Sequence, residues 1–156
     1  GQGVSGNLSA PSIVNSKVVD ALVELIQAHP GRKIVAEITE TALITQIDIA
    51  SNNIRRLRDA GCLVALDDFG SGYSSLRYLA SMPVDLIKFD ISMVRLLDSG
   101  DRRQQLMMEE IANLVVTAGY QMVAEGVETR ELLDKVIGLG FSHAQGFYFD
   151  RPMAPT

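Results

Sequence analysis

Polar side chains recur in this sequence at the carboxyl-terminal ends of short apolar runs. Six successive runs carry them, and in chain order they are Asn7, Glu37, Asp67 with Asp68, Lys88, Glu125 and Gln145. Carboxylate and amide oxygens are the ligands that hard cations such as Mg²⁺ or Mn²⁺ prefer, whereas zinc usually takes His or Cys. A carboxylate such as Asp67 can bridge two ions with Asp68 beside it, an arrangement suited to in-line phosphodiester hydrolysis. The residue types therefore indicate an acidic two-metal site with one amine.

Helix capping is the alternative explanation for an acidic residue at the end of a strand. Such a residue often accepts hydrogen bonds from the first backbone N–H groups of the next helix. Asp90, before Ile91-Ser92, and Glu128, before Thr129, are candidates for this role. Six successive strand ends with polar groups are harder to explain by capping alone.

The elements that must position these residues alternate between β-rich apolar runs and stretches with helical spacing. Strands are predicted near 33–38, 62–66, 85–89, 121–125 and 142–149, with a weaker one at 4–8. Helical spacing of apolar residues falls in 18–26, 47–57, 106–115 and 132–136, and helix-ending glycines follow at Gly31, Gly61, Gly119 and Gly140. Repeated β-then-α units predict a parallel sheet whose carboxyl ends share one face. An open doubly wound sheet and an incomplete eight-stranded barrel both fit this pattern.

Composition is that of an ordinary globular chain. The 156 residues are 47% hydrophobic and 21% charged, with a net charge of −5. This charge disfavours binding to a nucleic-acid polymer, although metal ions allow an acidic cleft to take a small anionic nucleotide. The single cysteine, Cys62, excludes an internal disulfide and is expected to be buried. No apolar run is long enough to span a bilayer, so we expect a cytoplasmic location without membrane contact by this segment, although a longer parent protein with a membrane anchor is compatible.

The stretch 68–76 is a glycine-rich loop directly after the two aspartates. As a phosphate cradle it is a weak signal, and a tight turn before a short helix explains it equally well. Its Asp-Phe-Gly triplet is shared with protein kinases, but the remaining kinase motifs are missing, so that interpretation is rejected.

Taken together, the motifs resemble those of the EAL domain family in order and approximate spacing. The resemblance covers nearly the whole chain, so residues 1–156 are expected to form the C-terminal two-thirds of an EAL domain. It implies a TIM-like (β/α)₈ barrel of the EAL type, incomplete at its N-terminal end. It also implies hydrolysis of cyclic di-GMP to linear pGpG with two Mg²⁺ or Mn²⁺ ions per site. The matching motifs are Asn7-Leu8-Ser9-Ala10, Glu37-Ile38-Thr39-Glu40, Asp67 to Ser75, Leu86 to Asp90, Ala124 to Thr129 and Gln145-Gly146-Phe147.

By this resemblance, five residues match the metal ligands of the family. Asn7, Glu37 and Asp67 resemble ligands of the first ion. Asp67 and Asp68 resemble ligands of the second ion, with Glu125 close by, directly or through water.

Other matches concern water and the loop. Lys88 resembles the residue that holds the attacking water or helps to deprotonate it, and Gln145 resembles a contact to the water network around the metals. Glu40 resembles the glutamate that orders the loop 69–75, which in the family couples dimerisation to metal binding. Glu128 resembles a supporting carboxylate.

Two side chains near the end of the chain are weaker matches, and two features depart from the family. Phe147 and Pro152 fit a guanine pocket, but core or turn roles are the more common explanation. The family's Glu-Ala-Leu stretch, with its metal-ligating Glu and a nearby phosphate-binding Arg, does not occur in this sequence. About two barrel strands are expected to be missing with it, which leaves edges that invite association. Gly6 stands where a β-branched residue would suit a strand better.

Three functions are compatible with the sequence. The first is a cyclic-di-GMP phosphodiesterase, with cyclic di-GMP, a homodimer partner and an upstream sensory or GGDEF domain as expected partners. The second is a catalytically incomplete module that binds cyclic di-GMP or a regulatory partner. The third, much weaker, is an unrelated metal-dependent barrel that uses Lys88 as an enolising base.

Overall fold

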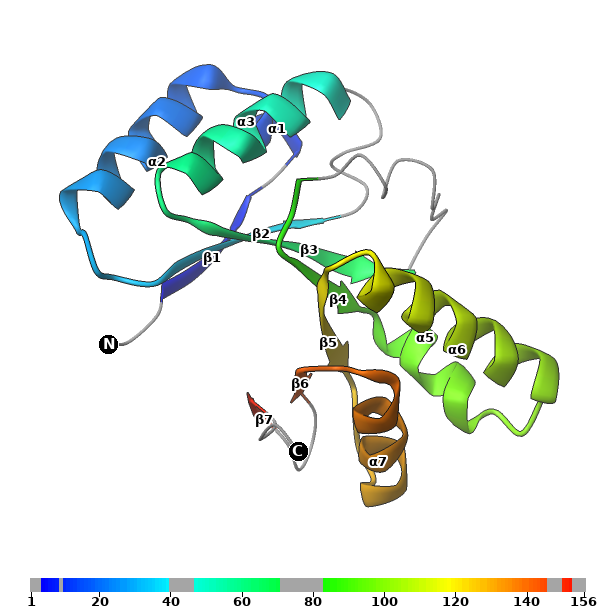
Figure 1. The fold of residues 1–156 in the computed structure, drawn as a ribbon. Helices are drawn as coiled ribbons and strands as arrows, with labels where there is room; N and C mark the ends of the chain where they lie inside the picture. The colour runs from blue at the N-terminus through cyan, green and yellow to red at the C-terminus, as the bar shows by residue number, and fades with distance from the viewer. Residues whose placement is uncertain (1–3, 9, 40–46, 71–82, 146–149, 153–156) are drawn as a thin grey trace. The chain divides into compact units, whose positions relative to one another are not determined.

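The computed structural model describes residues 4–8, 10–39, 47–70, 83–145 and 150–152, with backbone alone for 4–8, 10–11 and 150–152. The chain divides into two compact units, drawn together in Figure 1 and described separately below. The first unit holds described residues up to Asp67 together with 83–85, and the second holds 68–70 and the residues from Leu86 onward. Strand β3 (Leu63–Phe69) contributes its last two residues to the second unit.

The first unit is a parallel three-stranded arrangement of β1 (Val4–Leu8), β2 (Ile34–Thr39) and β3. Its helices are α1 (Ala10–Ile13), α2 (Ser16–Ala28) and α3 (Ile47–Asp59), and α2 and α3 lie side by side over the strands (Figure 1). The β-rich runs become strands because their branched side chains pack between the sheet and these helices. The buried core includes Val19, Ile38, Ile54, Leu57 and Leu66.

Polar side chains hold the helices of this unit in place. Asn15 caps α2, since its Oδ1 accepts hydrogen bonds from the backbone N–H groups of Lys17 and Val18. Asn53 is buried on α3, with 6% of its surface exposed, and its Nδ2 donates to the carbonyl oxygen of Ile13 at 2.6 Å. A buried amide requires such a partner, so this bond ties α3 to α1.

Besides the end of β3, the described residues of the second unit form three parallel strands and one antiparallel strand. The parallel strands β4 (Leu86–Phe89), β5 (Gln121–Glu125) and β6 (His143–Gln145) are followed by the antiparallel β7 (Asp150–Pro152). The helical segments are α5 (Ile91–Val94), the 3₁₀ turn η2 (Arg95–Asp98), α6 (Arg102–Thr117) and α7 (Arg130–Leu139). Parallel strands require such crossover helices between them.

A row of aromatic rings forms the centre of the second unit. Phe89 packs edge to face against Phe69 at 5.1 Å between ring centroids and against Phe141 at 5.0 Å. All three rings are at most 5% exposed. Edge-to-face packing of this kind adds to the burial energy, so the carboxyl end of β3 is fixed to β4 through Phe69.

Most predicted elements are confirmed. Each predicted helix lies within an observed helix, and the four helix-ending glycines all have positive φ between 86° and 107°. Cys62 is 4% exposed, as expected, and lies just before β3. Among the described residues, no helix combines the length and the apolar character that a bilayer crossing requires.

One expectation needs correction, and some elements were not predicted. The predicted strand at 142–149 is confirmed by β6 (His143–Gln145), whereas 146–149 lie outside the described residues; the antiparallel partner β7 was not predicted. The expected cap is confirmed for Asp90 but wrong for Glu128, because the side chain of Thr129 accepts the hydrogen bond from Leu132 N–H. The short segments α1, α5 and η2 were not predicted, since four residues show no clear helical period.

Candidate metal centre

Two carboxylates converge in the second unit. Carboxylate oxygens of Asp68 and Glu125 lie within 4.8 Å of one another, and both residues are half-buried. Asp67 directly precedes Asp68 in β3. Carboxylates at this separation repel one another unless protons or a cation neutralise them. The donors are all oxygen, so the set fits Mg²⁺ or Mn²⁺ rather than zinc.

Glu125 is held at the last position of strand β5. The three residues before it are buried, and its own Oε1 is enclosed by the protein. Glu125 pairs in register with Gln145, and the next bond of the ladder runs from Val127 N–H to the carbonyl oxygen of Gln145 at 3.0 Å. Gly126, between Glu125 and Val127, has φ of 75°, and the chain turns there. The backbone on both sides of Gly126 is therefore paired with Gln145.

Asp68 has an uncommon backbone conformation. Its φ is 58°, which no other non-glycine residue in the described part of the chain shares. Aspartate tolerates this left-handed region better than most residues, but the conformation persists only where neighbours enforce it. Here Phe69 supplies the constraint, because its ring is buried and its carbonyl oxygen accepts a hydrogen bond from Asp90 N–H at 2.9 Å.

Lys88 lies on the same side of the second unit's sheet as Glu125. It pairs in register with Val123, two residues before Glu125, and alternate residues of a strand point to the same face. Lys88 is half-buried, whereas Ile87 and Phe89 on either side are fully buried. The register with Gln145 adds that exposed residue to the same face. One sheet face thus presents the amine, the carboxylate and the amide that the sequence predicted at three different strand ends.

In the first unit, register brings the other predicted ligands close along neighbouring strands. Asn7 pairs with Glu37 between β1 and β2, and Thr39 pairs with Asp67 between β2 and β3. Because Glu37 and Thr39 are two residues apart, Glu37 and Asp67 share a face. Both are half-buried.

The other predicted site residues are Glu40, Glu128, Phe147 and Pro152. Glu40, Phe147 and the side chain of Pro152 lie outside the described residues, as does the loop beyond Gly70. Glu128 is exposed, and its carboxylate lies 3.9 Å from the guanidinium of Arg95. It is therefore near the turn after Glu125 but on the solvent side.

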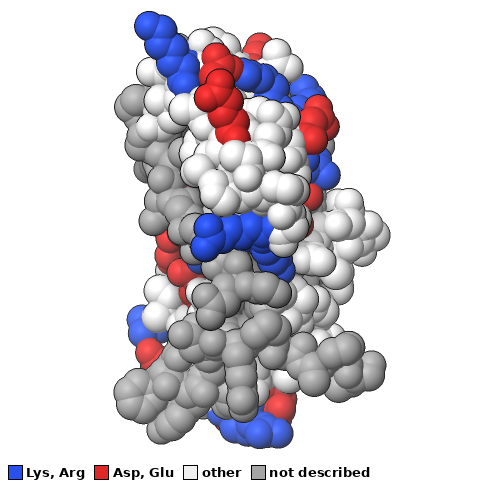
Figure 2. Space-filling model, turned by 90° about the vertical axis from the view of Figure 1, so that its left-hand side faces the viewer, with Lys and Arg blue, Asp and Glu red and all other residues white. Residues whose placement is uncertain are grey.

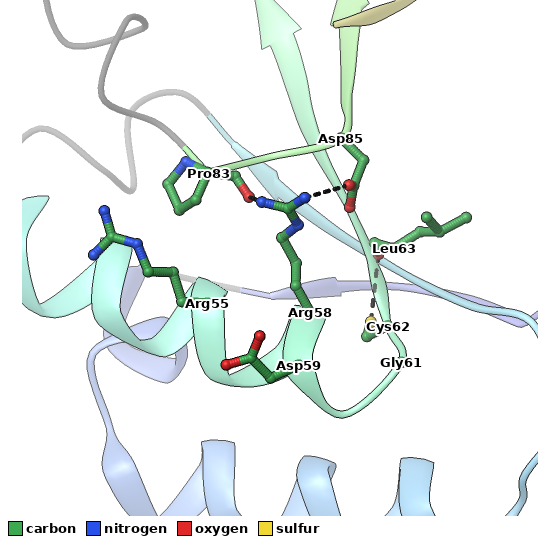
Figure 3. Close-up of a pocket in the computed structure, with 8 residues that line it drawn as sticks. All are labelled: Arg55, Arg58, Asp59, Gly61, Cys62, Leu63, Pro83 and Asp85. Atoms are coloured by element: carbon green, nitrogen blue, oxygen red, sulfur yellow. Dashed lines mark hydrogen bonds and ion pairs between the residues drawn. The ribbon is translucent and has the colours of Figure 1, made fainter. Parts of the chain in front are cut away.

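A separate pocket lies in the first unit at the amino-terminal end of β3, away from Asp67 (Figure 3). Its volume is about 500 Å³. Arg58 projects into it, and its guanidinium donates to the carbonyl oxygen of Pro83 at 2.9 Å and pairs with Asp85 at 3.1 Å (Figure 3). None of the predicted site residues that the structure describes lines this pocket. Its lining comprises Arg55, Arg58, Asp59, Gly61, Cys62, Leu63, Pro83 and Asp85.

Charged side chains of both signs are present on the surface. On the face shown in Figure 2, acidic and basic side chains of the described residues are interspersed and form no continuous basic surface.

The chain belongs to the EAL domain family, whose family model matches residues 2–152. Cyclic di-GMP phosphodiesterase RocR of Pseudomonas aeruginosa is 41% identical over 124 residues, which is 80% of this chain and 31% of that protein. Cyclic di-GMP phosphodiesterase PdeB of Shewanella oneidensis is 34% identical over 151 residues, which is 96% of this chain and 18% of that protein. The chain spans about a third or less of the length of these curated relatives.

Solved structures agree with the family. An EAL domain protein from Listeria monocytogenes superposes with a TM-score of 0.83 at 37% identity, covering 97% of this chain and 60% of that one. The PaMucR phosphodiesterase in complex with c-di-GMP gives a TM-score of 0.81 at 30% identity, covering 97% and 62%. These matches confirm the predicted α/β fold of the EAL, TIM-like type.

Proposed function

We propose that this chain supplies most of a two-metal phosphodiesterase site that hydrolyses cyclic di-GMP to linear pGpG. The observation that carries the proposal is the convergence of Asp68 and Glu125 at strand ends, in a chain whose relatives include enzymes named cyclic di-GMP phosphodiesterases. On this proposal residues 1–156 form the C-terminal two-thirds of an EAL domain. Mixed surface charge and an acidic centre favour a small nucleotide over a nucleic-acid polymer as substrate.

Five side chains would hold Mg²⁺ or Mn²⁺. Asn7, Glu37 and Asp67 are assigned to one ion, and Asp67 and Asp68 to the other, with Glu125 beside it. When bound, such ions neutralise the carboxylates, lower the pKa of water and stabilise the charge of the leaving oxygen. The half-burial of Glu37, Asp67, Asp68 and Glu125 supports the assignment, because partly buried acids of like charge require a counter-charge.

The residues on the second unit's sheet face would handle water. Lys88 holds the attacking water at Nζ and helps to remove its proton. Glu125 and Gln145 orient that water through their carboxylate and amide oxygens. The water oxygen bonds to phosphorus, the bond from phosphorus to the ribose 3′ oxygen breaks, and the 3′ oxygen takes up a proton. The product is linear pGpG.

Four further residues are assigned supporting or substrate-binding roles and take no direct part in bond breaking. Glu40 orders the loop 69–75 and couples metal binding to a homodimer, and Glu128 supports the carboxylate turn from outside. Phe147 and Pro152 contact a guanine base. The domain acts in the cytoplasm, under an upstream sensory or GGDEF domain.

A second function is a regulatory module that binds cyclic di-GMP or a protein partner without hydrolysis. It concerns these 156 residues by themselves, among which the Glu-Ala-Leu stretch of the family, with its metal ligand, does not occur. The remaining ligands would then bind ions or nucleotide more weakly.

Hydrolysis of cyclic di-GMP in the presence of Mn²⁺ separates the two functions. It is measured on this chain and on the same chain with an EAL-family segment carrying the Glu-Ala-Leu motif joined at its N-terminus. Turnover by both forms supports the enzyme, and turnover only by the extended form assigns the chain alone to the regulatory module. Turnover by neither form contradicts the phosphodiesterase assignment.

A further inference from the structure

One short segment of the second unit lies against the turns that follow two proposed metal ligands. This segment, residues 91–98 of α5 and η2, is called the strap below. Asp90 anchors its beginning, because its carboxylate accepts hydrogen bonds from the backbone N–H of Ser92 at 3.0 Å and from its hydroxyl at 2.6 Å. Lys135 of α7 anchors its end, with Nζ 3.1 Å from the carbonyl oxygen of Leu97 and 3.3 Å from Oδ1 of Asp98. The beginning of the strap is therefore capped by the residue before it, and its end is attached to α7.

Ile91 closes the turn after Glu125. A Cβ atom on Gly126 would lie 2.3 Å from Cγ1 and 2.5 Å from Cδ1 of Ile91. Real Cβ atoms do not approach other atoms this closely, and φ of 75° already favours glycine at this position. Gly126 thus lets the isoleucine side chain pack directly on the peptide next to Glu125.

Met93 makes the same kind of contact at the turn after Asp68. A Cβ atom on Gly70 would lie 1.9 Å from Cγ and 2.7 Å from Sδ of Met93, and Gly70 has φ of 96°. The strap also reaches this turn through the backbone, since Asp90 N–H donates to the carbonyl oxygen of Phe69. One segment therefore packs on both turns through two glycines.

Ordinary core packing of the strap is supplied by other side chains. Val94 is fully buried and Leu97 is 3% exposed, and these two anchor the strap in the core of the unit. Ile91 and Met93 are only half-buried, and each lies over a glycine turn instead.

We propose that Ile91 and Met93 are positioning residues that hold the turns after Glu125 and Asp68, and thereby fix where the two carboxylates meet. The metal-binding consequence rests on the function proposed above, whereas the restraint on the turns does not. A preorganised ligand set binds a cation more tightly because fewer side-chain and backbone freedoms are lost on binding.

The restraint on the turns is tested by amide hydrogen exchange of this chain without metal. The reporter is Val127 N–H, which bonds to Gln145 across the turn after Glu125. We expect Ile91→Ala to accelerate exchange at Val127 by about tenfold through local opening. The matched control is Ile137→Ala, a half-buried isoleucine of α7, which should leave Val127 within about twofold of the parent after correction for global stability. Equal acceleration by both variants would overturn the proposal.

A double-mutant cycle tests whether the contact is direct. Gly126→Ala alone should also accelerate exchange at Val127, since the new methyl group meets Ile91. In the combined variant Gly126→Ala with Ile91→Ala, the two closest atoms, Cγ1 and Cδ1, are gone and only Cβ of residue 91 remains, at 2.9 Å. The acceleration should therefore be smaller than the product of the two single effects. Effects that simply multiply would show that the two residues act independently and would contradict direct positioning.

Mn²⁺ affinity, measured by isothermal titration calorimetry on the same variants, tests the consequence for the site. Ile91→Ala and Met93→Ala should each weaken binding by about tenfold, comparable with the loss of a supporting partner, and Ile137→Ala should not. If Ile91→Ala and Met93→Ala both bind Mn²⁺ as tightly as the parent chain, the strap does not position the metal-binding carboxylates. If the parent chain itself binds no Mn²⁺, the proposed metal site in this chain fails, and hydrogen exchange alone decides the positioning role.

Discussion

Arg58 binds Asp85 through Nη2 and Oδ1 at 3.1 Å, while the other oxygen of that carboxylate accepts a hydrogen bond from the backbone N–H of Val64 at 2.9 Å. The backbone N–H of Asp85 in turn donates to the carbonyl oxygen of Val64 at 2.8 Å. Asp85 therefore occupies both backbone groups of a fully buried residue near the start of β3 (Figure 3 shows the Arg58 side of this contact). The same strand carries Asp67 at its other end.

Removing the Asp85 carboxylate should destabilise the fold. Asp85→Ala leaves the buried N–H of Val64 without its acceptor, which costs about 1–3 kcal/mol in the free energy of unfolding. Arg58→Ala should cost no more than about 1 kcal/mol from the ion pair, because both side chains are partly exposed. Urea unfolding of both variants measures the two effects. Asp85→Asn keeps an oxygen acceptor and serves as the control; an equal loss in Asp85→Asn and Asp85→Ala would contradict the role of the Val64 bond.

The bridging assignment of Asp67 gives the most direct prediction on activity. Loss of a supporting partner of a metal ligand already costs about 10–100-fold, so Asp67→Asn should lower turnover by more than about a hundredfold. The assay is hydrolysis of cyclic di-GMP with Mn²⁺, in whichever form of the chain proves active. Asp59→Asn, an exposed acid on α3, is the matched control and should retain activity. Near-normal turnover in Asp67→Asn would defeat the metal assignment.

The positions of most strands along the chain and of Lys88, Glu125 and Gln145 on them could be predicted because each depends on local information. An apolar run with a polar residue at its end marks a strand, and the topology of parallel β-α units then brings the ends to one face. These three residues share a face because side chains alternate along each strand and because the register aligns the neighbouring strands.

Other features depend on contacts between segments distant in the sequence and leave no local pattern. Asp85 was predicted as a strand residue, but it lies before β4 and uses its side chain on Val64. The contact of Ile91 with Gly126 likewise arises only when α5 folds over the end of β5. The left-handed backbone of Asp68 is enforced by packing of Phe69, which no propensity of aspartate alone would indicate.

Because Thr129 and not Glu128 caps α7, substitutions at these two neighbouring positions should have different effects on stability and on activity. Thr129→Ala removes the cap of α7 and should cost about 0.5–2 kcal/mol in the free energy of unfolding, while Thr129→Ser should largely preserve it. Glu128→Ala should leave stability almost unchanged, since its ion pair with Arg95 is exposed and long. If Glu128 supports the turn after Glu125 as proposed, Glu128→Ala lowers turnover of cyclic di-GMP although stability is almost unchanged. Thermal or urea unfolding and the hydrolysis assay together check both statements, and a large stability loss in Glu128→Ala would contradict them.

Cys62 gives the chain a pH dependence at the alkaline end. Burial raises the pKa of the Cys62 thiol, a hydrogen bond with the backbone of Ala36 lowers it by less, and the negative charge of Asp85 makes the smallest contribution, which raises it. Because the folded pKa lies above the unfolded pKa, the contribution to stability is complete below the unfolded pKa and is lost as pH rises through the folded pKa.

The stability of the parent chain relative to Cys62→Ala should therefore decline as pH rises from 7 to above about 8.5, the ordinary value for a thiol. Urea unfolding of both chains across this range measures the difference, and taking the difference cancels the titration of lysines and tyrosines common to both. Asp85→Asn supplies an independent check, because removing its charge should lower the pKa of Cys62 and speed alkylation by iodoacetamide at a fixed pH. A constant stability difference at all pH values would show that the thiol titrates alike in the folded and unfolded chain.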